Sequence, residues 1–166
     1  MPITQQELLD RTEILDALTA YSHGLDQRNW KIFDRAWADG ATFQAPGNGI
    51  DEPISAHALR ERLTSQNDAT RLSGQHLLNN TRFRIEGDSA HTVTEVTWVT
   101  LQQSHEPGLI YEVRAGGLYV DDLIRTEDGW RISKRVLALK NKSTRHVPYP
   151  EDRIAAIRNT LHTDWY

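Results

Sequence analysis

The sequence contains no cysteine, which excludes disulfide bonds, thiolate metal sites and cysteine nucleophiles. It also has no basic run longer than Lys140-Asn141-Lys142, and its net charge is −4. Proteins that bind nucleic acids concentrate basic residues on one face, so we expect no nucleic-acid partner. The 166 residues, of which 38% are hydrophobic and 25% charged, have a composition typical of one folded globular domain.

Long hydrophobic runs are absent as well. No segment approaches the roughly 18 apolar residues that a membrane-spanning helix needs, so we expect no membrane partner. The N-terminal segment 1–6 has neither a basic region nor an apolar stretch, so we expect no signal peptide and a cytoplasmic location. Glycine-rich phosphate-binding motifs and the Gly-x-Ser-x-Gly motif are missing, which leaves a nucleotide-binding or serine-hydrolase function without support.

The first part of the chain has the periodicity of helices. Thr4 and Glu7 fit a capping box, and apolar residues then recur at helical spacing until Gly24, a natural C-terminal stop. Asp26 is placed to cap a second helix. The pattern predicts helices over 4–23, 27–38 and 55–66, with a short strand at 41–45 before the third helix.

After residue 70 the chain becomes rich in Thr, Val, Ile and aromatic residues, which is typical of strands. We expect an antiparallel meander of strands at about 74–86, 90–104, 109–125 and 129–140, followed by a tail helix over 151–162. The glycine pair Gly116-Gly117 predicts a bulge or a sharp bend within the third of these strands.

Helices followed by a long curved sheet indicate the α+β class. We expect a cone-shaped α+β barrel over residues 1–145, with the N-terminal helices packed in the concave face of the sheet and a pocket at one end. Residues 146–166, which include Trp165, are then a C-terminal tail helix that packs on the same domain or on a partner subunit.

Asp26 has two possible roles. It is either the N-cap of the second predicted helix, a role that stabilises a helix by about 1 kcal/mol, or a carboxylate at the mouth of the pocket. Leu25, Trp30 and Tyr21 are close to it in the sequence. A carboxylate in such surroundings serves as a general base or orients a histidine.

His76 lies near the start of the first long predicted strand. Strict alternation places its side chain on the face of Arg84, opposite Phe83, and only a bulge near Asn79-Asn80 would turn it inward. His76 is therefore either a packed core residue whose hydrogen bonds are satisfied or the imidazole that transfers a proton. The other histidines form no metal-binding pattern, so we expect no protein-bound metal.

Several aromatic and basic residues are candidates for lining the pocket, although aromatic core packing is the alternative for each. Arg135 either reaches the pocket or lies on the outer face of its strand. The pocket candidates are Tyr21, Trp30, Phe43, Trp98, Tyr111, Arg114 and Tyr119.

Four sequence patterns support a family resemblance over about residues 8–140. They are Leu25-Asp26 with Trp30, the run Phe33-x-x-x-Trp37-x-Asp39, His76-x-x-x-Asn80, and Gly117-x-Tyr119-x-Asp121 followed by Asp128-Gly129-Trp130-Arg131-Ile132. This set resembles the SnoaL-like branch of the nuclear-transport-factor-2-like superfamily. That branch is close to scytalone dehydratase, bile-acid dehydratase and hexachlorocyclohexane dehydrochlorinase.

The resemblance implies that Asp26 and His76 form a catalytic dyad, with Tyr21 at the position of a tyrosine that assists in some dehydratases. It implies a cofactor-independent lyase that eliminates a group from a small apolar polycyclic or aromatic substrate. Gln102 replaces a further aspartate of the bile-acid dehydratase type, and residues 98–101 lack a second histidine found in scytalone dehydratase. Neither of these substrate classes is therefore favoured.

Two alternatives stay open. The chain is an isomerase or polyketide cyclase that uses the same dyad, or it is a non-catalytic small-molecule-binding protein or assembly protein similar to an oxygenase small subunit. In the second case Asp26 is a helix cap and His76 a packed core residue. The resemblance also implies a homo-oligomer, with a trimer preferred to a dimer.

Overall fold

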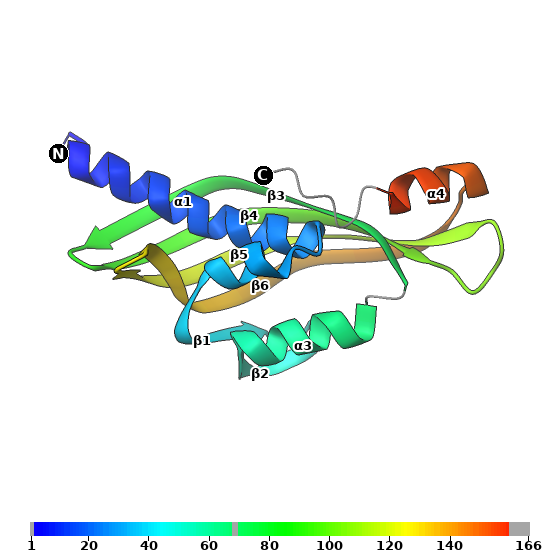
Figure 1. The fold of residues 1–166 in the computed structure, drawn as a ribbon, viewed down its shortest axis with the longest axis horizontal. Helices are drawn as coiled ribbons and strands as arrows, with labels where there is room; N and C mark the ends of the chain where they lie inside the picture. Colours follow the sequence, from blue (N-terminus) through cyan, green and yellow to red (C-terminus); the bar gives the residue numbers. More distant parts are fainter. Residues whose placement is uncertain (1, 68–69, 160–166) are drawn as a thin grey trace.

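The structure, a computed structural model, describes residues 2–67 and 70–159 and is shown in Figure 1. Its elements in chain order are α1 (Gln5–Asp26), α2 (Trp30–Arg35), β1 (Trp37–Ala45), β2 (Ile50–Ser55), α3 (Ala56–Asn67), β3 (Arg71–Glu86), β4 (Ser89–Gln103), β5 (Leu109–Thr126), β6 (Gly129–Pro148) and α4 (Glu151–Arg158).

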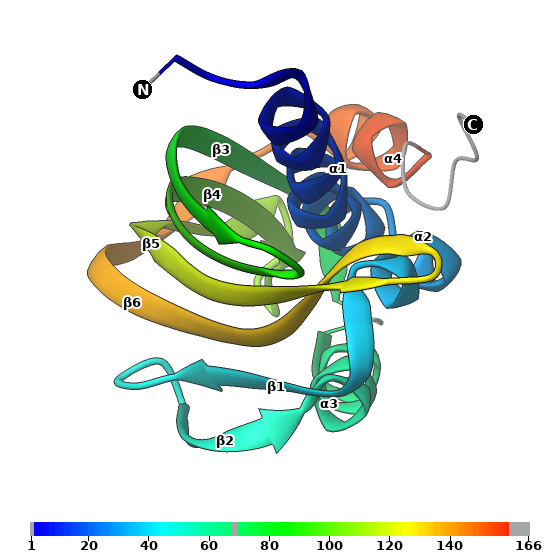
Figure 2. The same ribbon diagram turned by 90° about the vertical axis from the view of Figure 1, so that its left-hand side faces the viewer.

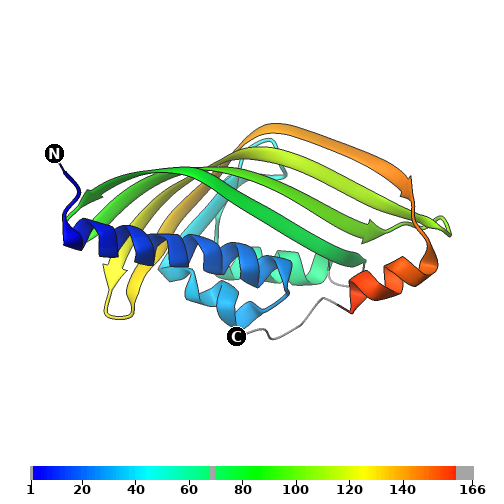
Figure 3. The same ribbon diagram turned by 90° about the horizontal axis from the view of Figure 1, so that it is seen from above.

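The strands form one six-stranded sheet in the order β2-β1-β6-β5-β4-β3. Strands β3 to β6 are the predicted antiparallel meander, and β1 joins β6 in parallel. Seen end-on, the sheet is strongly curled and α1 lies along its concave side (Figure 2). From above, it arches over α1, α2 and α3 (Figure 3). This architecture confirms the predicted α+β cone with its helices in the concave face.

The sequence pattern predicts that the first helix stops at Gly24. In the structure α1 continues past this residue to Asp26. The reason for the glycine is the close approach of α2. A Cβ atom at position 24 would lie 2.4 Å from the backbone nitrogen of Phe33, so only glycine lets the two helices meet this closely. Asp26 therefore ends a helix in place of capping the next one.

The N-cap of α2 is Asn29, whose side chain accepts a hydrogen bond from the backbone N–H of Ile32 at 3.2 Å. The prediction that Asp26 caps the second helix is wrong. The predicted helix 27–38 is also too long, because Trp37 already belongs to β1. The sequence pattern does not predict strand β2, because its segment Asp51-Glu52-Pro53 lacks alternating apolar residues.

The pairing register of the long strands shifts at four places, and two of these bulges bear on the site. In β3 the pairing with β4 shifts between Asn79 and Arg82, so two residues face one. Asn80 occupies the left-handed region with φ of 53°, a conformation that asparagine tolerates better than most residues. The second bulge lies where Gly116 and Gly117 pair with β6. An irregularity is predicted at these glycines, but the extra residue belongs to β6 and not to the strand that contains them.

The main core fills the space between the helices and the concave face of the sheet, and its largest members include Tyr21, Phe33 and Trp130. A smaller cluster lies under α4, where Ile154 packs with Leu72 and Ile110. Helix α4 ends at Arg158, and the remainder of the predicted tail helix, with Trp165, lies outside the described residues. None of the helices in the described ranges is long and apolar enough to cross a membrane.

Candidate functional site

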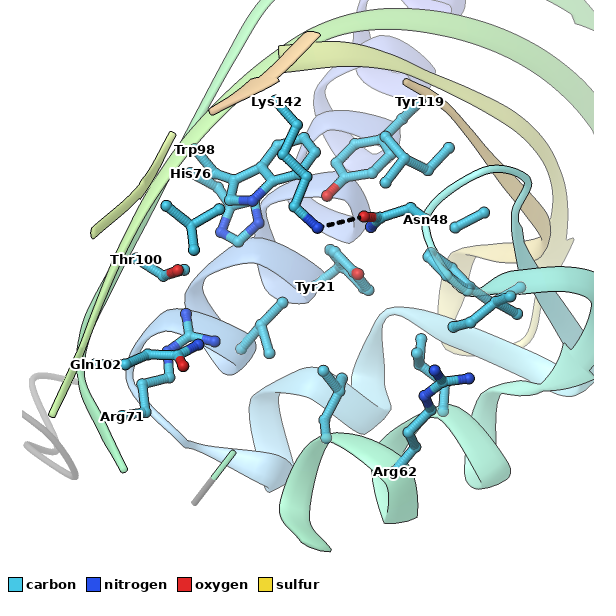
Figure 4. Close-up of a pocket in the computed structure, with 18 residues that line it drawn as sticks. Tyr21, Asn48, Arg62, Arg71, His76, Trp98, Thr100, Gln102, Tyr119 and Lys142 are labelled. Atoms are coloured by element: carbon cyan, nitrogen blue, oxygen red, sulfur yellow. Dashed lines mark hydrogen bonds between the residues drawn. The ribbon is translucent and has the colours of Figure 1, made fainter. Parts of the chain in front are cut away.

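A cavity of about 290 Å³ opens between the concave face of the sheet and helices α1 and α3 (Figure 4). Its walls are mixed, with aromatic and aliphatic side chains surrounding a few polar groups, as is usual for small-molecule sites. The apolar side chains that line it are Leu25, Phe43, Ala45, Ile50, Leu59, Leu63, Val113 and Leu137. The remaining lining residues are polar or aromatic and carry the chemistry described below.

The bulge in β3 turns His76 into this cavity. Alternation counted back from Phe83, which faces the core, places His76 on the outer face. The extra residue at the bulge reverses the alternation, so His76 and Phe83 both face inward. The prediction that only a bulge near Asn79-Asn80 would bring His76 inward is confirmed. Such bulges commonly re-aim a side chain next to a functional site.

Asp26 holds His76 through two hydrogen bonds. The Nδ1 atom of the imidazole lies 2.7 Å from Asp26 Oδ1, and the backbone N–H of His76 donates to Asp26 Oδ2 at 2.6 Å. A carboxylate only accepts hydrogen bonds, so in the neutral imidazole Nδ1 carries the proton and Nε2 has the free lone pair. Both side chains are nearly buried, with 6% of His76 and 10% of Asp26 exposed.

Arg71, which the sequence analysis did not identify, is the third member of this group. Its Nη2 atom lies 3.3 Å from Asp26 Oδ1. Gly74 makes room for this contact, because a Cβ there would lie 1.7 Å from Arg71 Nη2 and 2.8 Å from Asp26 Oδ1. The imidazole of His76 also stacks with the ring of Trp98, with the two ring centroids 5.9 Å apart. No local sequence signal identifies Arg71, since its partner is 45 residues away.

Two tyrosines form a second polar group on the cavity wall. Tyr21 and Tyr119 are both buried, with rings 5.6 Å apart. Behind them Arg135 forms a fully buried bidentate ion pair with Asp121, at 2.7 and 2.8 Å, and its guanidinium lies over both rings. Arg135 therefore lies beneath the wall of the cavity. It neither reaches into the pocket nor lies on the outer face of its strand, the two positions that the sequence left open.

Burial raises the pKa of Tyr21, and the positive charge of Arg135 and a hydrogen bond with Tyr119 offset part of that rise. Burial also raises the pKa of Tyr119 well above its ordinary value. Both hydroxyls thus keep their protons at neutral pH. Tyr119 donates its hydrogen to Tyr21, and the hydroxyl of Tyr21 is left as the donor that faces the cavity.

The structure brings together some of the predicted pocket residues and separates others. Those that line the cavity are Tyr21, Phe43, His76, Trp98 and Tyr119. Asp26 lies directly behind His76. Trp30, Tyr111 and Arg114, which are also predicted as pocket residues, do not border this cavity.

Each of these three side chains has a different environment. The ring of Trp30 packs against Phe33 and the guanidinium of Arg60. Tyr111 lies against the ring of His146, near the far end of β5. Arg114 is exposed on the opposite face of β5 from Val113, where its guanidinium binds Glu112.

Other polar residues on the wall were not predicted as site residues. They come from α3, from the turn between β1 and β2, and from β4 and β6: Asn48, Arg62, Thr100, Gln102 and Lys142. Among residues 2–67 and 70–159, no three His, Asp or Glu side chains are grouped so that they could hold a metal ion. The expectation that the protein binds no metal stays a prediction.

Comparisons with known proteins agree with this fold. The uncharacterized protein Rv2910c of Mycobacterium tuberculosis is 33% identical over 133 residues, which cover 78% of this chain and 85% of that protein. Hexachlorocyclohexane dehydrochlorinase LinA type 2 has a TM-score of 0.72 at 15% identity, covering 86% of this chain and 93% of the other.

A provisionally assigned scytalone dehydratase from Novosphingobium aromaticivorans has a TM-score of 0.71 at 16% identity, covering 87% of this chain and 94% of the other. At such low identities these two structures share the fold alone. Residues 6–136 match the family described as the SnoaL-like domain. The chain therefore belongs to the SnoaL-like domain family.

Proposed function

We propose that the protein is a cofactor-independent lyase that eliminates a small leaving group from an apolar ring compound. The observation that carries this proposal is the Asp26–His76 pair, joined at 2.7 Å and opening onto a cavity. A proton-transfer group must lie within hydrogen-bond reach of its partner and of the substrate, and this pair meets the first condition. The cavity of about 290 Å³ suits a molecule of one or two rings.

In the proposed reaction, Nε2 of His76 takes a proton from a carbon next to an activated position. Asp26 stabilises the imidazolium that forms, and the electron pair of the broken C–H bond becomes a double bond as the leaving group departs. The imidazolium then returns the proton to the leaving group, so that a hydroxide leaves as water or a halide as the acid. Tyr21, which is hydrogen-bonded to Tyr119, donates its own hydrogen to a substrate oxygen.

A proton relay of this kind contributes roughly 10²- to 10⁴-fold to the rate. Positioning in the cavity and electrostatic stabilisation by the tyrosine hydroxyls supply the remainder. The fold shared with a dehydrochlorinase and an assigned dehydratase supports an elimination.

The test is a screen of one- and two-ring alcohols, ketones and halides, with products identified by mass spectrometry. Loss of water or of hydrogen halide supports the lyase. A product of unchanged mass and altered retention time indicates the isomerase or cyclase alternative. If no compound is converted while several bind, the protein is a binding or assembly protein and the proposal is wrong.

A further inference from the structure

We propose that the mouth of this cavity is a binding site for a carboxylate, so that the ligand is an apolar ring compound with one acidic group. The ring end would lie against Tyr21, Phe43 and Trp98, and the carboxylate would bind Lys142 and Arg62. The inference names a ligand class for the site proposed above. It rests on the proposed function only for what happens at His76.

The charges of the cavity wall are of one sign. The cations that line it are Arg62, Arg71 and Lys142, and His76 lies beside them. No Asp or Glu is among its lining residues in the described chain. Asp26 lies behind the wall, where it binds Arg71 and His76. A cavity with low-dielectric walls and one sign of charge concentrates ligands of the opposite charge.

The second bulge places Lys142 in this position. Gly116 pairs with Asn141 and Gly117 with Leu139, which leaves Lys140 as the extra residue of β6. The interruption reverses the alternation along the strand, so two lysines that are two residues apart point to opposite faces. Lys140 binds Glu95 on the outer face at 2.6 and 2.8 Å, whereas Lys142 lines the cavity.

The hydrogen-bond partner of Lys142 is neutral. Its Nζ atom donates to the amide oxygen of Asn48 at 2.9 Å, the contact drawn as a dashed line in Figure 4. Among the described residues, no carboxylate lies within ion-pair distance of this ammonium group. An ammonium group has three donors, so Lys142 retains donors for a ligand as well as its full charge.

Arg62 approaches the same turn from α3. A Cβ atom at Gly49, the neighbour of Asn48, would lie 3.3 Å from Arg62 Nη2. The turn between β1 and β2 thus has an arginine and a lysine beside it, one from each side of the opening (Figure 4). A carboxylate beside this turn would have Lys142 as its principal partner and the positive charge of Arg62 on the other side, and it can accept hydrogen bonds on both oxygens.

The test compares two probes with the same rings, 2-naphthoate and the neutral 2-naphthalenemethanol, by isothermal titration calorimetry at low salt. We expect wild-type protein to bind the acid more tightly. Lys142→Met removes a charge-assisted hydrogen bond and should weaken naphthoate binding roughly 10-fold, with the alcohol unchanged. Lys140→Met makes the same change of net charge on the outer face and should leave both affinities unchanged.

Calorimetry measures binding without turnover, so a preference for the acid over the alcohol tests this site separately from the lyase proposal, which the substrate screen tests. Equal affinity of wild type for the two probes would overturn the carboxylate site. An equal loss in Lys140→Met and Lys142→Met would overturn it too, because the effect would then come from net charge alone.

Discussion

Asp26 uses both of its oxygens on the residue that is proposed to move the proton. One oxygen accepts from the backbone N–H of His76 and the other from the ring, so the carboxylate fixes the position of the residue and the tautomer of the imidazole together. A helix cap would have used one of these oxygens, and Asn29 performs that task for α2 instead. The geometry therefore removes the cap interpretation that the sequence left open.

This arrangement predicts the tautomer of His76. We expect ¹⁵N NMR of the ligand-free protein, recorded where the imidazole is neutral, to show the proton on Nδ1 and none on Nε2, because the carboxylate accepts from Nδ1. In Asp26→Asn the preference should weaken, since the amide offers a donor as well as an acceptor. A wild-type spectrum with the proton on Nε2 would contradict the proposed general base.

The bulge in β3 is the element that makes His76 part of the site, and it depends on the left-handed conformation of Asn80. A β-branched residue is strained there, so Asn80→Val should lower the free energy of unfolding by about 1–2 kcal/mol. Asn80→Gly should be close to neutral, as glycine adopts this conformation freely. Urea unfolding of the two variants measures the difference; equal stability of Val and Gly would count against the bulge.

At the junction of α1 and α2, helix propensity and packing predict opposite effects. Alanine is the better helix former by about 1 kcal/mol, so propensity alone favours Gly24→Ala. The added Cβ would overlap the backbone of Phe33, and overpacking of this kind typically costs about 1–3 kcal/mol. We expect a net loss of stability in thermal unfolding, and an increase in melting temperature would show that α2 does not pack this closely.

The strands, the helix junction and the cavity residues differ in how far the sequence predicts them. The strands after residue 70 were found because their alternation is long and local. Asp26 stood out as a carboxylate at a helix junction and His76 as a histidine in a strand, and the family resemblance paired them. The end of α1 was missed, since Gly24 serves a contact with a later helix and not a stop. Arg71 and Lys142 were missed because tertiary contacts and a bulge, which leave no periodic signal, give them their positions.

Across the whole molecule, Asp10 joins α1 to the hairpin between β5 and β6. Its carboxylate accepts hydrogen bonds from Arg125 at 2.7 Å, Gln6 at 3.0 Å and Trp130 at 3.3 Å. Burial acts to raise the pKa of Asp10, but these hydrogen bonds outweigh it and hold the pKa below its ordinary value. The stabilisation is present above the pKa of the unfolded chain and is lost as the pH falls through the folded pKa.

Asp10→Asn should therefore lower the free energy of unfolding at pH 7 by about 1–3 kcal/mol. The difference in unfolding free energy from wild type should shrink as the pH falls below about 4. There the carboxylate of the unfolded chain takes up a proton first, and the folded carboxylate follows at lower pH. Glu13→Gln, an exposed change on the same helix, is the control and should have little effect. A difference from wild type that stays constant down to pH 3 would show that the charge of Asp10 is not involved.

The molecule also contains an internal control for its proposed active site. His91 and Asp122 form a second pair at 2.7 Å, but they lie on the outer face of the sheet and away from the cavity. If the hydrogen-bonded pair alone were sufficient, both pairs would be equivalent. The proposed chemistry requires the pair together with the cavity, the tyrosines and the exclusion of water.

The most direct measurement is the turnover of the best substrate from the screen by wild type, His76→Ala and His91→Ala. We predict that His76→Ala lowers kcat about 10²- to 10⁴-fold, the usual contribution of a general base, while His91→Ala keeps wild-type turnover. Unfolding curves confirm that both variants are folded. Unchanged turnover in His76→Ala, or an equal loss in the two variants, would contradict the Asp26–His76 mechanism.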